Sequence, residues 1–261
     1  MASKNVLVVG GSGYIGRVLV DDLIKEQKKV INLDFKIYPD QKGKTFISYQ
    51  NENYINLDLR DTKSIKNYLS SANAVIILAG LVGEHITKKY PLLSETINEK
   101  GIIDLIDECD NYKNIKNLIF VSTCSNYGIT KNQTLVSEDH ELKPLSPYAK
   151  AKVKIEKYIL DKKNTLYSPT ILRFATAFGY SPRMRFDLTV NHFCYSMYKE
   201  KEIEVYDPDT WRPYCHVKDF SRLIKKILIS ERKKIYKKVF NAGSNLNNFT
   251  KSGIISLISK K

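Results

Sequence analysis

The chain has 261 residues, of which 43% are hydrophobic, and it carries a formal net charge of +14. This length is sufficient for one α/β unit with a small additional lobe and a sizeable core. The longest apolar run, residues 74–83, is far shorter than the roughly 20 residues of a transmembrane helix, so no membrane association is expected. The lysines are spread along the chain without a nucleic-acid-binding motif, so the charge favours an anionic small molecule over a nucleic acid.

The four cysteines form no CxxC pair, and the histidines show no metal-ligand spacing. We therefore expect free thiols in a reducing compartment and no bound metal. The first residues contain one lysine before an apolar run at 6–9, which is typical of a strand rather than of a signal peptide. These features predict a cytoplasmic protein.

Apolar strand-like runs alternate with segments of helical periodicity over residues 6–174. The predicted strands cover residues 6–9, 30–33, 54–57, 74–78, 118–121 and 170–174. The predicted helices between them cover residues 14–26, 62–69, 93–108 and 147–160. Such alternation indicates an α/β protein with a doubly wound parallel sheet and right-handed crossovers.

The pattern becomes less regular after Gly179. Helices are predicted there over residues 188–199, 217–230 and 251–260, and strands over residues 202–206 and 238–241. We expect residues 1–179 to form the main domain. Residues 180–261 are expected to form a small, shortened C-terminal lobe that is interleaved with the first domain and lies over the carboxyl ends of the sheet.

A glycine-rich turn follows the first predicted strand and opens the first predicted helix. Gly10, Gly13 and Gly16 have the spacing GxxGxxG, which permits a tight turn and a close approach of the backbone to a pyrophosphate. Asp34 ends the second strand, about 20 residues further on, where a carboxylate binds a ribose 2′-hydroxyl. A carboxylate repels a 2′-phosphate, although Lys36 lies close by. The sequence therefore predicts a Rossmann-like fold that binds NAD in preference to NADP.

Tyr148 and Lys152 lie four residues apart in a predicted helix, so they share one face. Ser146 is a suitable N-cap and Pro147 suits the first helical position. A nearby ammonium stabilises a phenolate and lowers the pKa of a tyrosine. Such a tyrosine can take the proton of an alcohol while the alcohol carbon loses a hydride.

The strand predicted over residues 118–121 is followed by hydroxyl side chains, including Ser122 and Thr123. These residues fall at the carboxyl edge of the sheet, where doubly wound folds bind their ligands. A hydroxyl group there can donate a hydrogen bond to the reacting oxygen. A turn that satisfies its own backbone would have the same composition.

With these motifs in this order, the chain resembles an extended short-chain dehydrogenase/reductase of the nucleotide-sugar epimerase/dehydratase group. The resemblance extends over nearly the whole chain. Besides the motifs above, it rests on Asp58-Leu59-Arg60-Asp61, Leu78-Ala79-Gly80, Asn98, Tyr127-Gly128, Leu172-Arg173-Phe174, Phe178-Gly179, Arg212, His216-Val217-Lys218-Asp219 and Asn241-Ala242-Gly243.

The resemblance implies NAD as cofactor and a nucleoside-diphosphate sugar as substrate. Thr123 would polarise the substrate oxygen, Tyr148 would be the acid/base, and Lys152 would bind the ribose and tune Tyr148. The residues expected at the cofactor are Gly10, Gly13, Tyr14, Ile15, Gly16, Asp34, Asp58, Leu59, Leu78, Ala79, Gly80, Asn98, Ser122, Tyr148, Lys152 and Phe174. Those expected at the substrate are Thr123, Thr176, Asn191 and Arg212, with Arg212 on the diphosphate.

The resemblance also implies a homodimer and leaves the reaction open. An epimerase that oxidises the sugar at C4 is the leading interpretation; a 4-dehydrogenase or reductase with net redox turnover and a non-catalytic NAD-binding regulator are the alternatives. Dehydratases of this group carry an Asp-Glu pair directly after the catalytic threonine. Cys124 and Ser125 occupy those positions here, which argues against dehydration. Thr176 stands where the group often has Asn, and the chain ends soon after Lys251, where relatives continue.

Overall fold

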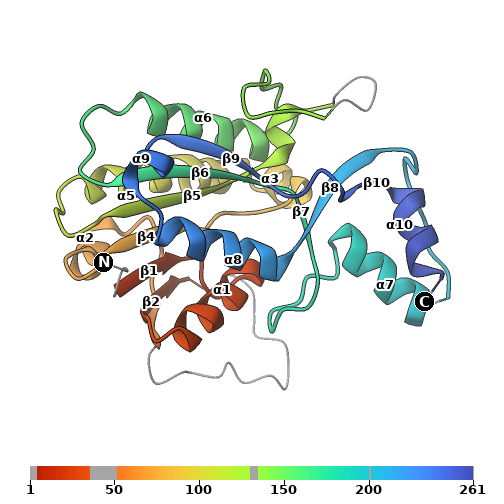
Figure 1. Ribbon diagram of the computed structural model, residues 1–261, viewed down its shortest axis with the longest axis horizontal. Coiled ribbons are helices and arrows are strands. Elements are labelled where there is room, and N and C mark those ends of the chain that lie inside the picture. Colours follow the sequence, from red (N-terminus) through yellow and green to blue (C-terminus); the bar gives the residue numbers. More distant parts are fainter. Residues whose placement is uncertain (1–4, 36–51, 130–134, 200, 261) are drawn as a thin grey trace.

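The computed structural model describes residues 5–35, 52–129, 135–199 and 201–260. Its main layer is a parallel sheet with the strand order β3-β2-β1-β4-β5-β6-β9 (Figure 1). This order begins in the middle of the sheet and runs outward in both directions, as in a doubly wound Rossmann-like fold. The predicted α/β class is therefore confirmed. The strands are β1 (Asn5–Val9), β2 (Lys29–Asp34), β3 (Glu52–Asn56), β4 (Ala74–Ile77), β5 (Asn117–Thr123), β6 (Ser168–Phe174) and β9 (Lys238–Ala242).

Helices cover both faces of this sheet (Figure 1). On one face, α1 (Tyr14–Lys25) and α8 (Val217–Leu228) pack on side chains such as Val6 and Val8 of β1. On the other, α2 (Thr62–Leu69), α5 (Ile102–Cys109) and α6 (Pro147–Asp161) pack on Leu7 and Val9 of the same strand. Because successive side chains of a strand point to opposite faces, the continuous apolar runs are buried on both sides.

The helix predicted over residues 93–108 is part of a longer helical stretch. It consists of α4 (Pro91–Glu95), a π-helical segment η1 (Thr96–Gly101) and α5, and it follows the short helix α3 (Glu84–Lys89). π-Helical turns inside helices often occur at functional sites. Here the turn contains Asn98, which is completely buried against the loop after β4. No described helix has both the length and the apolar character needed to cross a membrane.

A second, smaller lobe lies beyond the carboxyl ends of the main sheet (Figure 1). It contains α7 (Thr189–Lys199), α10 (Lys251–Ile258) and a sheet of β7 (Thr176–Phe178), β8 (Trp211–His216) and β10 (Asn248–Thr250). The strand predicted over residues 202–206 does not form. Ile203 and Val205 are partly buried, as their alternation predicts, but no described strand pairs with this segment, and a ladder requires a partner.

The chain returns to the main domain between the two parts of the lobe. Helix α8 packs against α1, the short helix α9 (Arg232–Ile235) follows it, and β9 pairs in parallel with β6. The main domain and the lobe are therefore interleaved along the sequence.

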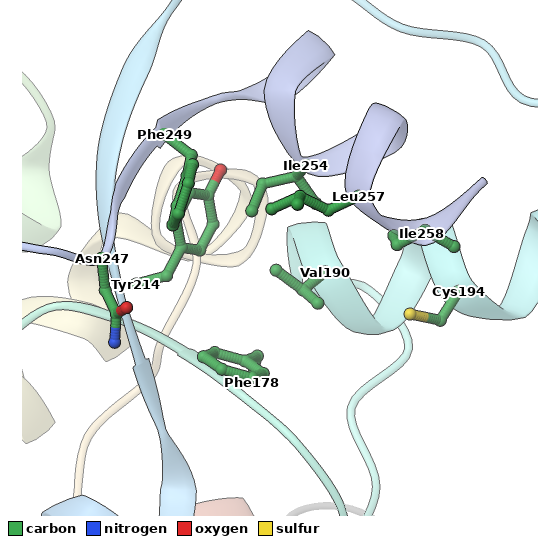
Figure 2. A pocket seen from close by; sticks show the side chains of 9 residues that line it. All are labelled: Phe178, Val190, Cys194, Tyr214, Asn247, Phe249, Ile254, Leu257 and Ile258. Carbon is green, nitrogen blue, oxygen red and sulfur yellow. The ribbon is translucent and has the colours of Figure 1, made fainter. Parts of the chain in front are cut away.

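The lobe contains an open cavity of about 330 Å³. Figure 2 shows its lining, which comes from β7, β8, α7, α10, β10 and the turn before β10 and consists of Phe178, Val190, Cys194, Tyr214, Asn247, Phe249, Ile254, Leu257 and Ile258. The Tyr214 hydroxyl is buried and has no hydrogen-bond partner among the described residues. None of the predicted catalytic residues lines this cavity, so it is separate from the predicted active site.

Candidate active site

The glycine-rich turn joins the carboxyl end of β1 to the start of α1. Gly10 has a φ of +89°, and a Cβ atom on it would lie 2.6 Å from the backbone nitrogen of Ala79. A Cβ on Gly16 would lie 2.4 Å from the Gly10 carbonyl oxygen, so neither position has room for a side chain. Helix α1 begins after Gly13 without a side-chain cap. The N–H groups of its first turn, those of Tyr14, Ile15 and Gly16, are thus placed to meet an anion.

Asp34 ends β2 directly beside this turn. Its Oδ2 atom accepts a hydrogen bond from the backbone N–H of Ser12 at 2.9 Å. The structure therefore holds a carboxylate against the glycine-rich turn, as the sequence predicts. Lys36, which the sequence places near Asp34, lies outside the described residues.

The loop after β4 forms the other side of the turn. The backbone N–H groups of Leu78 and Ala79 both donate to the Val9 carbonyl oxygen at 2.9 Å. Asn98 holds the continuation of this loop: it accepts from the Leu81 N–H at 2.7 Å and donates to the Leu81 carbonyl oxygen at 3.0 Å. A Cβ on Gly80 would lie 2.8 Å from Asn98 Oδ1. The Asn98 side chain therefore supports the loop on which any cofactor contact here depends.

Three other predicted cofactor residues have side chains that are already engaged. Asp58 forms an ion pair with Arg60 at 2.5 Å, and this hydrogen bonding holds the pKa of the carboxyl below its usual range. Leu59 is buried in the core. Phe174 stacks on Phe220 with ring centroids 3.8 Å apart. The side chains of Leu59 and Phe174 thus contribute mainly to packing.

The predicted catalytic helix begins as its sequence indicates. Ser146 caps α6 by accepting from the Ala149 N–H at 3.2 Å, and Pro147 occupies the first turn. Lys152 is only 2% exposed, and its ammonium donates to the Val121 carbonyl oxygen at 2.8 Å. The same nitrogen lies 5.7 Å from the centre of the Tyr148 ring. The i, i+4 pair therefore faces β5 on one side of the helix.

Thr123 is the last residue of β5 and begins the short 3-10 helix η2 (Cys124–Tyr127). Its Oγ1 atom accepts from the Ser125 N–H at 3.2 Å. Helix α6 packs against both β5 and η2. The fold thus brings Thr123, Tyr148 and Lys152 to the same edge of the sheet, although they come from separate segments.

The electrostatics of the tyrosine differ from the expectation. Burial raises the pKa of Tyr148 to about 12 and lowers the pKa of Lys152 to about 7. The prediction that Lys152 lowers the pKa of Tyr148 is wrong for this structure, because desolvation dominates and the ammonium is directed at the Val121 carbonyl. The positive charge that opposes the rise at Tyr148 belongs to Arg185. Sequence reasoning missed Arg185, because nothing in its neighbourhood signals proximity to residue 148.

Two of the predicted substrate residues lie on the small sheet. Thr176 begins β7 opposite Tyr214 of β8, and it is partly buried. Arg212 lies on β8 and is exposed. Burial raises the pKa of the Cys124 thiol, and the charge of Arg212 acts against that rise, so Arg212 lies close to the residue that follows Thr123. The structure therefore places a cation near Cys124, at the end of β5 that carries Thr123.

Asn191, the remaining predicted substrate residue, joins the lobe to the glycine-rich turn. Its amide nitrogen donates to the Tyr14 hydroxyl at 3.1 Å and to the Arg185 carbonyl oxygen at 3.0 Å, and its oxygen accepts from the Gly179 N–H at 2.9 Å. The Tyr14 hydroxyl donates to the Gly179 carbonyl oxygen at 2.6 Å. Both amide hydrogens of Asn191 are therefore used within the protein, and its observed contacts bind the loop before α7 to α1.

Comparison with known proteins decides the family. The model of the NAD-dependent epimerase/dehydratase family matches residues 6–243. The chain belongs to this family. As its members depend on NAD, the cofactor is NAD. Among the described residues no group of three or more His, Cys, Asp or Glu side chains is arranged to hold a metal ion.

The proteins similar to this family member include several that are named as epimerases. This chain is 28% identical over 240 residues to the uncharacterized UDP-glucose epimerase YtcB of Bacillus subtilis (strain 168). The alignment covers 85% of this chain and 72% of YtcB. The structure of a UDP-N-acetylglucosamine 4-epimerase from Methanobrevibacter ruminantium M1, in complex with UDP-N-acetylmuramic acid, superposes with a TM-score of 0.87 at 26% identity and covers 100% of this chain and 82% of that one. The structure of a UDP-glucuronic acid 4-epimerase from Bacillus cereus, in complex with UDP-glucuronic acid and NAD, superposes with a TM-score of 0.85 at 27% identity. The match covers 98% of this chain and 82% of that one.

The described residues fit the cofactor of the family. A pyrophosphate needs close approach to the backbone and unpaired N–H groups, which the Gly10–Gly16 turn and the uncapped start of α1 provide. An NAD ribose needs a hydrogen-bond acceptor near this turn, and Asp34 carries one. The carboxyl ends of β4 and β5 bound the space between this turn and Tyr148.

Proposed function

We propose that this family member oxidises a nucleoside-diphosphate sugar at C4 and acts as a 4-epimerase. The observation that carries the proposal is the convergence of Tyr148 and Lys152 of α6 on the end of β5, where Thr123 begins η2. An alcohol that is to lose a hydride needs a group that removes its proton at the same time. Tyr148, four residues before Lys152 on α6, is the group to which we assign this task.

In the proposed reaction the C4 hydroxyl proton passes to the Tyr148 oxygen, while Thr123 hydrogen-bonds the reacting oxygen. NAD, bound along the glycine-rich turn and Asp34, supplies the hydride acceptor. Lys152, whose ammonium is held at the Val121 carbonyl oxygen, would bind the ribose of the cofactor. The bound cofactor would supply reversible hydride transfer at C4, and Tyr148 would give the proton back to the C4 oxygen to complete the epimerisation. Arg212 binds the diphosphate of the substrate.

Dehydration is not part of the proposal, because the groups after Thr123 are poor acids. Elimination of water from the sugar requires one group to remove a C5 proton and another to protonate the leaving hydroxyl. Cys124 and Ser125 stand at these positions, and burial raises the pKa of the Cys124 thiol further. A thiol with a raised pKa holds its proton at neutral pH and acts weakly as an acid or as a base.

Incubation with NAD and a panel of nucleotide sugars, followed by mass spectrometry and NMR, tests the reaction type. We expect a product of unchanged mass with inverted configuration at C4. Loss of two hydrogens would instead favour a dehydrogenase with net redox turnover, and a product lighter by one water would contradict the proposal. The Tyr148→Phe variant is the control, because it keeps the fold and lacks the proposed acid/base.

Preference for NAD over NADP follows from Asp34. Its carboxylate, held by the Ser12 N–H, would accept a hydrogen bond from the ribose and repel a 2′-phosphate. We expect the unmodified protein to bind NAD more tightly than NADP. In Asp34→Ala the ratio of the two dissociation constants should fall by about 10- to 100-fold, the value of a charge-assisted hydrogen bond. Isothermal titration calorimetry with both dinucleotides measures this ratio. Asp104→Ala, at an exposed ion pair with Lys100, should leave the ratio unchanged; tighter binding of NADP by the unmodified protein would refute the assignment.

The proposal extends to a homodimer, which the resemblance to this family implies. The alternative is a non-catalytic NAD-binding regulator on the same fold. Such a regulator would bind NAD and show no turnover with any nucleotide sugar of the panel, so the turnover measurement distinguishes the two.

A further inference from the structure

A row of buried polar side chains crosses three strands just below the candidate active site. Ser122 of β5 lies opposite Arg173 of β6, and Arg173 lies opposite Asn241 of β9. Glu156 of α6 reaches this row: its Oε2 atom accepts from Arg173 Nη2 at 2.7 Å, and both side chains are at most 5% exposed. A charged pair at this depth is unusual, because Glu and Arg side chains are rarely buried unless they are paired.

Glu156 also contacts the turn that Thr123 begins. The amide nitrogen of Asn126, in η2, donates to Glu156 Oε1 at 2.7 Å and to Ser122 Oγ at 3.0 Å. Asn126 is completely buried. Glu156 lies on α6, and its carboxylate thus accepts hydrogen bonds from Arg173 of β6 and from Asn126 of η2.

Arg173 extends the same connection. Its Nη1 atom donates to the Tyr127 hydroxyl at 2.8 Å, and that hydroxyl donates to Asn241 Oδ1 at 2.6 Å. Tyr127 is the last residue of η2. Glu156 therefore holds η2 at Asn126, and Arg173, which is paired with Glu156, holds it at Tyr127.

Glu156 lies four residues after Lys152, on the same face of α6. Its negative charge opposes the effect of burial on the Lys152 pKa. The other charged or titratable groups nearby are Tyr148 of α6, on which Cys124 of η2 and Arg185 of the loop after β7 act, and Arg173 of β6, which is paired with Glu156. Among these described groups, Glu156 is the anion that acts on Lys152.

Stability of the fold is a weak reason for such a pair. The cost of removing two charges from water offsets most of their attraction, and apolar replacements of a buried ion pair are often at least as stable. The contacts have a clearer consequence for geometry, because they connect the helix that carries Tyr148 and Lys152 to the turn that carries Thr123.

We propose that Glu156 is a positioning residue for the reaction, and that its carboxylate, through Asn126 and Arg173, fixes the Thr123 turn relative to Tyr148 and Lys152 on α6. It touches neither substrate nor cofactor and acts through these residues. The inference rests on the catalytic roles proposed above for Thr123, Tyr148 and Lys152.

Glu156→Gln in the full chain tests the proposal with two independent measurements. The first is kinetic: kcat with NAD and nucleotide sugar should fall by roughly 10- to 100-fold, the cost of misplaced catalytic groups, with KM almost unchanged. Since loss of the negative charge makes the Lys152 ammonium less stable, the limb of the pH–kcat profile that reports Lys152 should move to lower pH. A purely structural role would lower activity without moving this limb.

The second measurement does not depend on turnover. Hydrogen–deuterium exchange of the peptide that contains residues 123–128 should be faster in Glu156→Gln, while peptides from the start of β5 keep their protection. Asn126→Ala removes the contact to the turn and leaves the Glu156–Arg173 pair in place. It should accelerate the same exchange and lower kcat without shifting the Lys152 limb.

Glu99→Gln is the matched control, because Glu99 pairs with Lys154 on the outer side of α6. It should change neither kcat nor exchange. Wild-type kcat and wild-type exchange in both Glu156→Gln and Asn126→Ala would overturn the proposal. If the unmodified protein turns over no nucleotide sugar, the proposed function fails, and the exchange measurement still decides whether Glu156 holds the turn.

Discussion

Replacing Tyr148 with Phe is expected to lower turnover of the nucleotide sugar by about 10²–10⁴-fold, the usual contribution of a general acid–base group. The change removes one oxygen and keeps the aromatic ring, so α6 and the contact of Lys152 with Val121 should persist. NAD affinity should therefore remain almost unchanged. Steady-state kinetics and a fluorescence titration with NADH measure the two effects.

The pH dependence of the unmodified enzyme belongs to the same prediction. Burial raises the pKa of Tyr148 to about 12, so the phenolate is scarce at neutral pH and becomes more abundant as the pH rises. Burial lowers the pKa of Lys152 to about 7, so its positive charge is lost as the pH rises through that value. We therefore expect two separate limbs in the pH–kcat profile, the lower one from Lys152 and the higher one from Tyr148.

Tyr158→Phe is the matched control for this variant. Tyr158 lies on the same helix, and its hydroxyl contacts Asp107 on the outer side. It should keep the turnover of the unmodified protein. Equal turnover in Tyr148→Phe and Tyr158→Phe would eliminate Tyr148 as the acid/base.

Replacing Arg212 with Ala is expected to weaken binding of the nucleotide sugar by about 10- to 100-fold, since charge-assisted hydrogen bonds are worth about 1.5–3 kcal/mol. Arg212 is exposed on β8 and close enough to Cys124 for its charge to act on that thiol. It takes part in none of the contacts described above for the glycine-rich turn, so NAD binding should be spared. Arg212→Lys should give an intermediate loss, because a lysine keeps the charge but not the forked pair of donors.

Calorimetric titration with the nucleotide sugar in the presence of NAD measures this effect. Arg222→Ala removes an equal charge from an exposed ion pair with Asp219 on α8 and serves as control. An unchanged dissociation constant in Arg212→Ala would count decisively against a role at the diphosphate.

Local sequence patterns were sufficient for the fold class and for the individual motifs. The glycine spacing, the carboxylate at Asp34 and the i, i+4 pair on α6 each depend on residues close in sequence, whose geometry follows from the period of a helix or strand. The alternation of apolar runs and helical segments likewise predicted the parallel sheet, because a strand that must return in the same direction needs a crossover. The segment 202–206 shows the limit: its alternating burial was predicted correctly, but no strand among the described residues pairs with it.

Only the tertiary structure decided which partner each polar side chain of the site contacts. Asn191 donates to Tyr14 across 177 positions of sequence, and Arg173 meets Glu156 across an interface of sheet and helix. No spacing rule relates such pairs, since they meet only after the strands have taken their order in the sheet. The raised pKa of Tyr148 has the same origin, because desolvation depends on everything packed around the hydroxyl and not on the lysine four residues away. The sequence alone determined which chemical groups this family member carries, and the packing of distant segments decided which of them are bound to one another and which face the reaction.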